Sequence, residues 1–351
     1  MNKIRVNASS SYDIFIGKDI LSQSGQIIKE IFPPCKVALI SDSNVMPLYG
    51  PVVKNALREV GFSVFPYVFP AGEASKSLDT VAKLLDFFSE NGLTRSDIAI
   101  ALGGGVTGDL TGFAASIFLR GIRYIQIPTS LLAAVDSSVG GKTGVDLPVG
   151  KNLAGSFWQP SLVLCDTGVF KTLSPHFLSD GLSEVVKYGM IADRDLFDRL
   201  KNQPVTDFFN DIVTTCVSIK RDIVEKDEFD QNERHLLNFG HTIGHAVEKL
   251  SNYNISHGHG VAIGMACMAI ASDALGLTLE PCADKTIELL KTLNLPVKCP
   301  FSAEQVTRAA LNDKKVKSDT ITLIILKKIG EAALHKIDVS RLETFLSAGI
   351  D

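Results

Sequence analysis

Short apolar runs rich in β-branched residues recur through the first half of the chain, separated by stretches with helical periodicity. The N-terminal 17 residues also alternate apolar and polar positions, as a strand does. Strands that alternate with helices predict a parallel sheet. The apolar runs cover residues 36–40, 63–68, 97–102, 124–127 and 161–165.

The pattern changes after Pro175, where strand signals nearly disappear and helical periodicity dominates. A run of β formers over residues 320–326 predicts one late strand or the arm of a hairpin. We therefore expect an α/β domain over residues 1–170 and a mostly α-helical domain over residues 171–351. The predicted helices cover residues 194–201, 206–226, 236–251, 260–276 and 283–293.

Composition narrows the class of protein. The 351 residues suffice for two domains, and 45% hydrophobic with 21% charged residues is typical of a globular chain. A net charge of -4 provides no global positive field, which disfavours nucleic acid as the main partner.

The sequence also predicts a cytoplasmic protein without membrane contact. Residues 261–271, the longest strongly apolar stretch, are too few for a membrane span, and the N-terminus lacks the apolar core of a signal peptide. The six cysteines include no Cys-x-x-Cys pair and are typical of reduced core thiols.

A glycine-rich turn follows the apolar run that ends at Leu102. Gly103, Gly105 and Gly108 form a G-x-G-x-x-G pattern between a predicted strand and a predicted helix, which is typical of a pyrophosphate-binding turn. The acidic residue usual after the next strand is missing, but Asp42 follows an earlier strand. Either a dinucleotide lies across two βα units, or the turn is a tight glycine turn and Asp42 a helix cap.

Residues 136–152 are too glycine-rich for a regular element, and predict a long ordered loop that serves a ligand. Lys142 and Lys151, with Arg120 upstream, would attract a small phosphorylated or carboxylated substrate. A solvated surface loop is the alternative.

Four of the seven histidines lie within residues 241–259, a concentration that favours a metal site. His241 and His245 are four residues apart and share a helix face, so spacing alone favours this pair as ligands. Glu184, on a predicted apolar helix, is a candidate carboxylate ligand. Any one of these histidines taken alone is also consistent with a core or capping role.

Several long motifs in order resemble the 3-dehydroquinate synthase family. The resemblance extends in register from about residue 42 to residue 331. The motifs are GGGVTGDL at 103–110, QIPTSLLAAVDSSVGGKTGVD at 126–146, GKNLAGSF at 150–157, EVVKYGMI at 184–191 and RHLLNFGHTIGHAVE at 234–248.

The resemblance implies a Rossmann-like NAD-binding domain, a helical metal domain and a cleft between them with a zinc or cobalt ion. It places the metal on Glu184, His241 and His257, and makes His245 a substrate-side residue. The implied NAD contacts are Asp42, Asn44, Glu73, Lys76, Gly104, Gly105, Val106, Asp109, Thr129, Ser130, Lys142, Lys151 and Thr172. The implied substrate contacts are Arg120, Asp136, Lys142, Lys151, Asn152, Lys187, Lys220, Arg234, Asn238, His245, Lys314 and Lys315.

Two positions depart from the family pattern. His259 stands where the family usually has glutamate, and Ser130 stands where it usually has threonine. The first change would either place a neutral or cationic group beside the metal or have no effect.

The implied activity is a phosphorus–oxygen lyase of the shikimate pathway, which leads to aromatic amino acids. NAD+ oxidises a hydroxyl of 3-deoxy-D-arabino-heptulosonate 7-phosphate, phosphate is eliminated, the same cofactor re-reduces the ketone, and an aldol closure yields 3-dehydroquinate. Charge suggests Lys151, Asn152 and Lys315 for the phosphate. The family also implies a homodimer. Another sugar phosphate cyclase, a metal-dependent polyol dehydrogenase of the same fold, and a non-catalytic binding protein are the alternatives.

Overall fold

The computed structural model describes residues 1–313 and 319–350, which form two compact units. The first unit comprises Met1–Leu173 and Lys220–Phe229, and the second comprises the described residues of Ser174–Ile219 and Asp230–Asp351. The segment Lys220–Phe229, placed in the helical domain by the sequence prediction, groups with the first unit. Its contacts explain this, because Lys220 forms an ion pair with Asp136 and donates to the carbonyl of that residue at 2.6 Å.

A seven-stranded sheet forms the centre of the first unit, in the order β1-β2-β9-β6-β5-β3-β4. β1 pairs with β2 antiparallel, and every other neighbouring pair is parallel, which confirms the predicted parallel sheet. The strands are β1 (Asn2–Val6), β2 (Tyr12–Gly17), β3 (Lys36–Asp42), β4 (Ser63–Phe69), β5 (Ile98–Gly103), β6 (Arg123–Pro128) and β9 (Leu162–Asp166).

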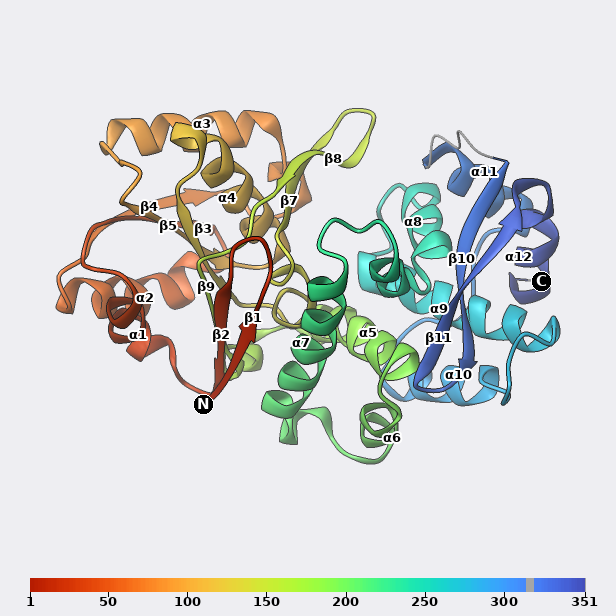
Figure 1. Cartoon of the computed structure of the whole chain (residues 1–351). Helices are drawn as coiled ribbons and strands as arrows, with labels where there is room; N and C mark the ends of the chain where they lie inside the picture. The colour runs from red at the N-terminus through yellow and green to blue at the C-terminus, as the bar shows by residue number, and fades with distance from the viewer. Residues whose placement is uncertain (314–318, 351) are drawn as a thin grey trace. The chain divides into compact units, whose positions relative to one another are not determined.

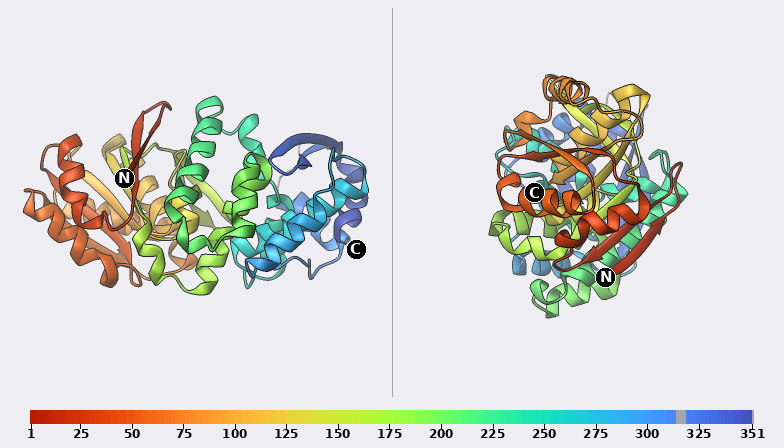
Figure 2. Two further views of the ribbon diagram at one scale, coloured as in Figure 1. Left: turned by 90° about the horizontal axis from the view of Figure 1, so that it is seen from below. Right: turned by 90° about the vertical axis from the view of Figure 1, so that its left-hand side faces the viewer.

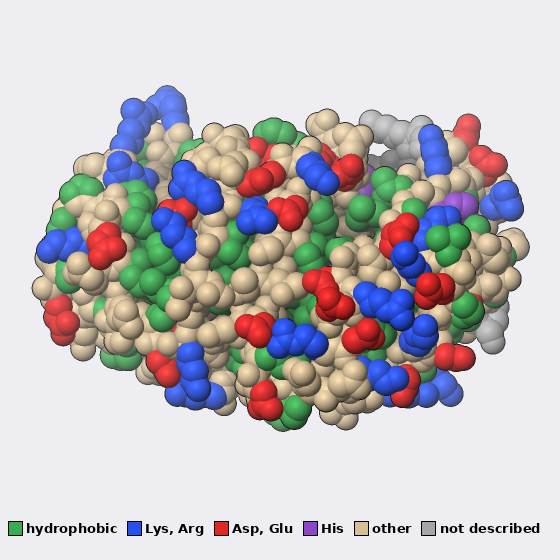
Figure 3. Space-filling model, turned by 60° about the horizontal axis from the view of Figure 1, so that its bottom comes forward, with side chains coloured by type: hydrophobic (Ala, Val, Ile, Leu, Met, Phe, Trp, Pro, Cys, Tyr) green, Lys and Arg blue, Asp and Glu red, His purple; other side chains and the backbone are tan. Residues whose placement is uncertain are grey.

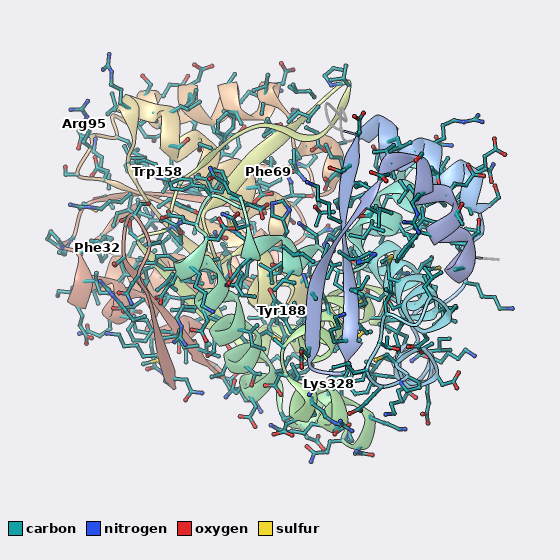
Figure 4. All side chains as sticks on the ribbon, turned by 45° about the vertical axis from the view of Figure 1, so that its right-hand side comes forward. Phe32, Phe69, Arg95, Trp158, Tyr188 and Lys328 are labelled. Carbon is teal, nitrogen blue, oxygen red and sulfur yellow. The ribbon has the colours of Figure 1, made fainter. Side chains whose placement is uncertain are left out.

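Helices cover both faces of this sheet. α3 and α4 lie together on one side, and α1 and α2 lie together on the other (Figure 1). Phe69, Phe88 and Tyr124 belong to the core on the α3–α4 side, with Trp158 packed against it (Figure 4). The helices are α1 (Ser24–Ile31), α2 (Met46–Glu59), α3 (Leu78–Glu90) and α4 (Gly105–Ile117).

The glycine-rich segment near residue 140 is not the irregular loop that we expected. It forms an antiparallel hairpin of β7 (Lys142–Leu147) and β8 (Gly150–Phe157), in which Gly144 lies opposite Gly155. A Cβ on Gly144 would lie 2.7 Å from the carbonyl oxygen of Ala154, so the two backbones approach too closely for side chains. The glycines therefore permit strand pairing here, and the prediction of a loop was wrong.

The second unit is mostly helical and includes one hairpin, of β10 (Thr320–Lys328) and β11 (Glu331–Asp338). This hairpin packs beside α5 and α9 (Figure 2). The helices are α5 (Pro175–Ile191), α6 (Arg194–Asn202), α7 (Phe209–Lys226, shared with the first unit), α8 (His241–Leu250), α9 (His257–Ala274), α10 (Ala283–Thr292), α11 (Ala303–Asp313) and α12 (Leu342–Ile350). These elements confirm the predicted helices and late strand.

α9 contains the long apolar run at its centre, and its buried residues extend over most of its length. Across the described residues, we find no helix with the length and apolar character that a bilayer crossing requires. The run is thus accounted for by burial among α5, α8, α10 and α12.

Candidate metal and cofactor sites

Three side chains from three helices of the second unit meet in one donor cluster. Glu184 comes from α5, His241 is the first residue of α8, and His257 is the first residue of α9. Oε1 of Glu184 lies 3.5 Å from Nε2 of His241 and 3.6 Å from Nε2 of His257. Ligands about 2.0–2.1 Å from a tetrahedral metal lie about 3.3 Å apart, so this spacing and donor chemistry fit a zinc-like ion.

The second ring nitrogen of each histidine has its own partner. Nδ1 of His241 lies 3.2 Å from the carbonyl oxygen of Phe239, and Nδ1 of His257 lies 2.9 Å from Oε1 of Glu248. Both partners are acceptors, so each Nδ1 is placed to donate a proton, and each Nε2 faces Glu184 and can supply the lone pair that a metal needs. The two imidazoles are therefore oriented for metal binding by the protein itself.

Burial and charge affect the two histidines differently. Burial lowers the pKa of His241 to about 3, against the opposing charge of Glu184. Burial also lowers the pKa of His257, but hydrogen bonds and charges from Glu184 and Glu248 outweigh it and raise that pKa to about 10. His241 is thus a neutral ligand at neutral pH, whereas His257 sits between two carboxylates.

Lys187 occupies the other side of the Glu184 carboxylate. Its ammonium forms an ion pair with Oε2 of Glu184, and both side chains are fully buried. The ammonium also lies 5.0 Å from the ring centre of Tyr188, which Figure 4 marks on α5. The two carboxylate oxygens therefore have separate roles, one facing the histidines and one holding the lysine.

His245 belongs to a different group from the one that its spacing suggested. His245, Glu248 and His257 form a second possible cation-binding cluster, and neither cluster among the described residues contains both His241 and His245. The ring of His245 is exposed and lies 5.4 Å from that of His241, centre to centre. This position is consistent with the substrate-side role that the resemblance implies.

His259 faces away from the donor cluster. Its Nε2 lies 3.0 Å from Oγ of Ser179, and its ring lies 4.8 Å from that of His176, centre to centre. These side chains line a cavity of about 690 Å³ at the ends of α5, α6, α9 and α10. Burial lowers the pKa of His259, so the substitution adds a neutral ring outside both clusters.

In the first unit, the predicted cofactor residues gather at one edge of the sheet. Asp42 ends β3, Gly103 ends β5 and Pro128 ends β6, and these three parallel strands are neighbours. The backbone N–H of Thr129 donates to the carbonyl of Gly103 at 2.9 Å. The carboxyl edge of such a sheet is where doubly wound proteins bind nucleotides.

The glycines of the turn before α4 divide into two kinds. A Cβ on Gly103 would lie 2.7 Å from Cβ of Thr107, and one on Gly108 would lie 2.5 Å from Oε1 of Gln126, so packing explains both. A Cβ on Gly104 would meet nothing closer than Oγ of Ser130 at 3.5 Å. Protein packing does not require glycine at Gly104, whereas a pyrophosphate at the α4 N-terminus would.

Lys76 links the predicted cofactor and substrate residues of this unit. Its ammonium lies 2.7 Å from Oδ2 of Asp109 and donates to Oδ1 of Asn152 at 2.5 Å. Burial lowers the pKa of Lys76, but Asp109 and Glu73 outweigh it and raise that pKa. A protonated Lys76 therefore ties the β7–β8 hairpin to α4, and Lys151 on that hairpin lies 3.7 Å from Glu73.

Other predicted cofactor residues have local partners. Oδ1 of Asp42 accepts the backbone N–H groups of Asn44 at 2.8 Å and Val45 at 3.0 Å, as a capping residue does. Thr172 lies 2.7 Å from the hydroxyl of Tyr49. The capping role leaves the ribose contact of Asp42 a prediction.

The predicted substrate residues are spread over both units. Asp136, Lys142 and Lys220 belong to the first unit, and Arg120 adopts a left-handed backbone conformation there (φ 66°). Arg234 and Asn238 belong to the second unit, with Arg234 buried at 2% exposure. Lys314 and Lys315 lie outside the described residues.

Two acidic residues with contacts next to the proposed metal ligands were not identified from the sequence. Glu248 contacts His257, and Asp180 on α5 accepts from Oγ of Ser256 at 2.5 Å and from the backbone of His259 at 3.2 Å. The signal for Glu248 was its spacing, because it follows His241 by two helical turns on the same face. Asp180 had no such signal.

The comparisons with known proteins agree over most of the chain. Residues 66–180 match the 3-dehydroquinate synthase N-terminal family, and residues 181–316 match the 3-dehydroquinate synthase C-terminal family. The chain is 43% identical to a 3-dehydroquinate synthase of Streptococcus suis over 98% of its length and 99% of the relative. It is likewise 43% identical to one of Clostridium acetobutylicum, over 96% of each chain.

Solved structures support the same placement. A 2-deoxy-scyllo-inosose synthase complexed with carbaglucose-6-phosphate, NAD+ and Co2+ is similar, with a TM-score of 0.88, 25% identity and coverage of 99% of this chain and 100% of that one. The 2-epi-5-epi-valiolone synthase of Streptomyces hygroscopicus, with NAD+ and Zn2+ bound, has a TM-score of 0.87 and 26% identity, over 98% of each chain. With both halves matched and full-length relatives at this identity, the chain belongs to the 3-dehydroquinate synthase family.

Proposed function

We propose that Glu184, His241 and His257 hold a divalent metal ion, and that the carboxyl edge of the first unit's sheet holds NAD, for the 3-dehydroquinate synthase reaction. That reaction converts 3-deoxy-D-arabino-heptulosonate 7-phosphate to 3-dehydroquinate and phosphate. The observation that carries the metal assignment is that Nε2 of both histidines faces the same oxygen of Glu184, at 3.5 and 3.6 Å. The NAD and Co2+ or Zn2+ named for the two similar structures support both cofactors.

When bound, NAD supplies reversible hydride transfer and the metal supplies a Lewis acid for a substrate hydroxyl. The residues of the second unit position that hydroxyl and balance its charge. Lys187 is buried and donates to the second oxygen of Glu184. This contact places a positive charge beside the metal ligands, where it would stabilise a substrate alkoxide. His245, exposed beside the cluster, provides an imidazole for proton transfer at the substrate.

In the first unit, the backbone N–H groups at Gly104 and Gly105 would hold the pyrophosphate of NAD at the start of α4. Lys76 holds Asn152 in place from one side, and Asp146 accepts the Asn152 backbone N–H at 2.8 Å from the other. Asn152 and Lys151 are thereby presented on the hairpin for the substrate phosphate. Lys220, paired with Asp136, provides a further cationic contact for the anionic substrate.

The net charge of the chain gives this substrate no general attraction. On the face that Figure 3 shows, basic and acidic side chains of the described residues are interspersed. The net charge of -4 has the sign of the substrate. Binding of a dianionic sugar phosphate therefore depends on the few lysines and arginines named above.

The test is turnover of the purified protein with the heptulosonate phosphate, a trace of NAD+ and Co2+ or Zn2+. Equal amounts of phosphate and 3-dehydroquinate, without net NADH, are expected. Net NADH would indicate a polyol dehydrogenase, and turnover only with another sugar phosphate would indicate a different cyclase. Loss of activity with a chelator, and its return with the ion, tests the metal requirement.

Two further features belong to this proposal. We expect a homodimer in the cytoplasm, as the family implies. Sedimentation of the purified protein and fractionation of cells test these points, with a monomer or a membrane-associated pool as the contrary result.

A further inference from the structure

The carboxylate of Glu248 is buried beside a metal ligand without being one of the three proposed ligands. The residue is 3% exposed, and Oε1 lies 2.9 Å from Nδ1 of His257. A buried carboxylate is costly unless it is hydrogen-bonded or paired. The contact with His257 therefore links the placement of Glu248 to the orientation of that imidazole.

Each of the two ring nitrogens of His257 faces a different carboxylate. Nδ1 faces Glu248, while Nε2 lies 3.6 Å from Oε1 of Glu184. A proton on Nδ1 satisfies Glu248 and leaves a lone pair on Nε2, whereas a lone pair on Nδ1 would face the Glu248 oxygen directly. Glu248 thus favours the tautomer that a metal at Nε2 requires.

His241 differs from His257 in the charge of the group that its Nδ1 faces. Its Nδ1 faces a neutral acceptor, the carbonyl oxygen of Phe239, at 3.2 Å. A carboxylate acceptor at Nδ1 increases the electron density on the imidazole. Nε2 of His257 is therefore a more basic metal ligand than Nε2 of His241. The two histidine ligands are therefore unequal, and the difference originates at Glu248.

Glu248 lies at the interface between α8 and α9, where a Cβ on Gly260 would lie 3.3 Å from its Cγ. α8 and α9 approach through glycines at two successive turns: a Cβ on Gly264 would lie 2.8 Å from the carbonyl carbon of Gly240, and one on Gly244 would lie 3.0 Å from that of Gly260. Glu248 and His257 lie one helical turn further along the same interface. The glycine contacts at the two preceding turns hold α8 and α9 together. The contact between Glu248 and His257 can therefore serve to orient the His257 ring.

We propose that Glu248 is a positioning residue for the metal, which fixes the tautomer and ring orientation of His257. This inference rests on the proposed metal site. Removing such a partner typically weakens metal binding by about 10–100-fold.

The experiment measures the dissociation constant of Co2+ by chelator competition, on the full chain first stripped of metal. Glu248→Ala removes the acceptor, and Glu248→Gln keeps an acceptor oxygen but removes the charge. Glu304→Gln, on an exposed residue of α11, is the matched control. We expect Co2+ binding to weaken about 10–100-fold in Glu248→Ala, less in Glu248→Gln, and not in the control.

A second measurement separates positioning from a structural role. Nitrogen-15 NMR of histidine in the metal-free protein reports which ring nitrogen carries a proton, and the visible spectrum of bound Co2+ reports its coordination. We expect the Nδ1–H form of His257 in the wild type at a pH where the ring is neutral, a mixture of tautomers in Glu248→Ala, and an altered Co2+ spectrum. These readouts do not depend on turnover.

The outcomes distinguish this inference from the proposed function. If His241→Ala binds Co2+ as tightly as wild type, the metal site itself is wrong. If His241→Ala loses Co2+ while folded Glu248→Ala keeps wild-type affinity and spectrum, only the role of Glu248 is overturned. Weaker binding with unchanged histidine tautomers also overturns it, and assigns Glu248 to packing.

Discussion

Gly258 is the position where a single methyl group tests the coupling between helix packing and the metal cluster. It lies between His257 and His259 in the first turn of α9, against α5. A Cβ there would lie 2.7 Å from the carbonyl carbon of Asp180 and 2.5 Å from Oγ of Ser183. Carbon atoms pack about 3.5–4.0 Å apart, so Gly258→Ala requires α9 and α5 to separate locally by about 1 Å.

That separation has two consequences. Overpacking of this kind costs about 1–3 kcal/mol, offset by about 0.4–1 kcal/mol because alanine restricts the unfolded chain more than glycine does. It also moves His257 away from Glu184, from the present 3.6 Å between Nε2 and Oε1. A further 1 Å would widen this separation to about 4.6 Å, well beyond the edge of about 3.3 Å between two ligand atoms of a tetrahedral ion. We therefore expect lower stability and at least tenfold weaker metal binding.

The assay combines urea unfolding of the metal-free protein with Co2+ titration. The control is Ala274→Gly, at the exposed C-terminal end of α9, which changes helix propensity by up to about 1 kcal/mol without steric change. We expect the control to retain wild-type metal affinity. A Gly258→Ala protein with wild-type stability and wild-type metal affinity would show that the α5–α9 contact does not set the ligand geometry.

Three further results are expected. Gly105→Val should raise the KM for NAD+, because the valine side chain would occupy the approach to the α4 N-terminus. An unchanged KM would show that NAD does not bind at this turn. Lys151→Ala should lower kcat/KM by about one to two decades and weaken a phosphonate analogue far more than an analogue without phosphate; equal weakening of both would assign the lysine elsewhere. Burial raises the pKa of Cys35 to about 11 and that of Cys267 to about 12, so both should react slowly with a thiol reagent at pH 8 until the protein unfolds; rapid reaction of the native protein would contradict this.

The local pattern of hydrophobic and polar residues determined which segments of the two units form strands and which form helices. The apolar runs that became β3, β5 and β6 are short and β-branched, and each precedes a polar or glycine-rich turn, so the parallel sheet and its carboxyl edge were predictable. The turn from Gly103 to Gly108 was likewise readable, because its chemistry lies within six consecutive residues.

Interactions between distant segments could not be read in this way. Residues 136–152 were expected to form a loop because they are rich in glycine, but the pairing of Gly144 with Gly155 requires glycine for close backbone approach. Strand pairing of this kind depends on a partner segment, which a local pattern does not specify.

The metal cluster shows the same division. Spacing identified His241 and His245 because periodicity reports one helix at a time. The tertiary structure instead brings His241 together with Glu184 and His257, from three helices whose backbones touch at glycines. The sequence by itself determined that histidines and a carboxylate are available, and only the packing of α5, α8 and α9 decided which nitrogen atoms face the same oxygen.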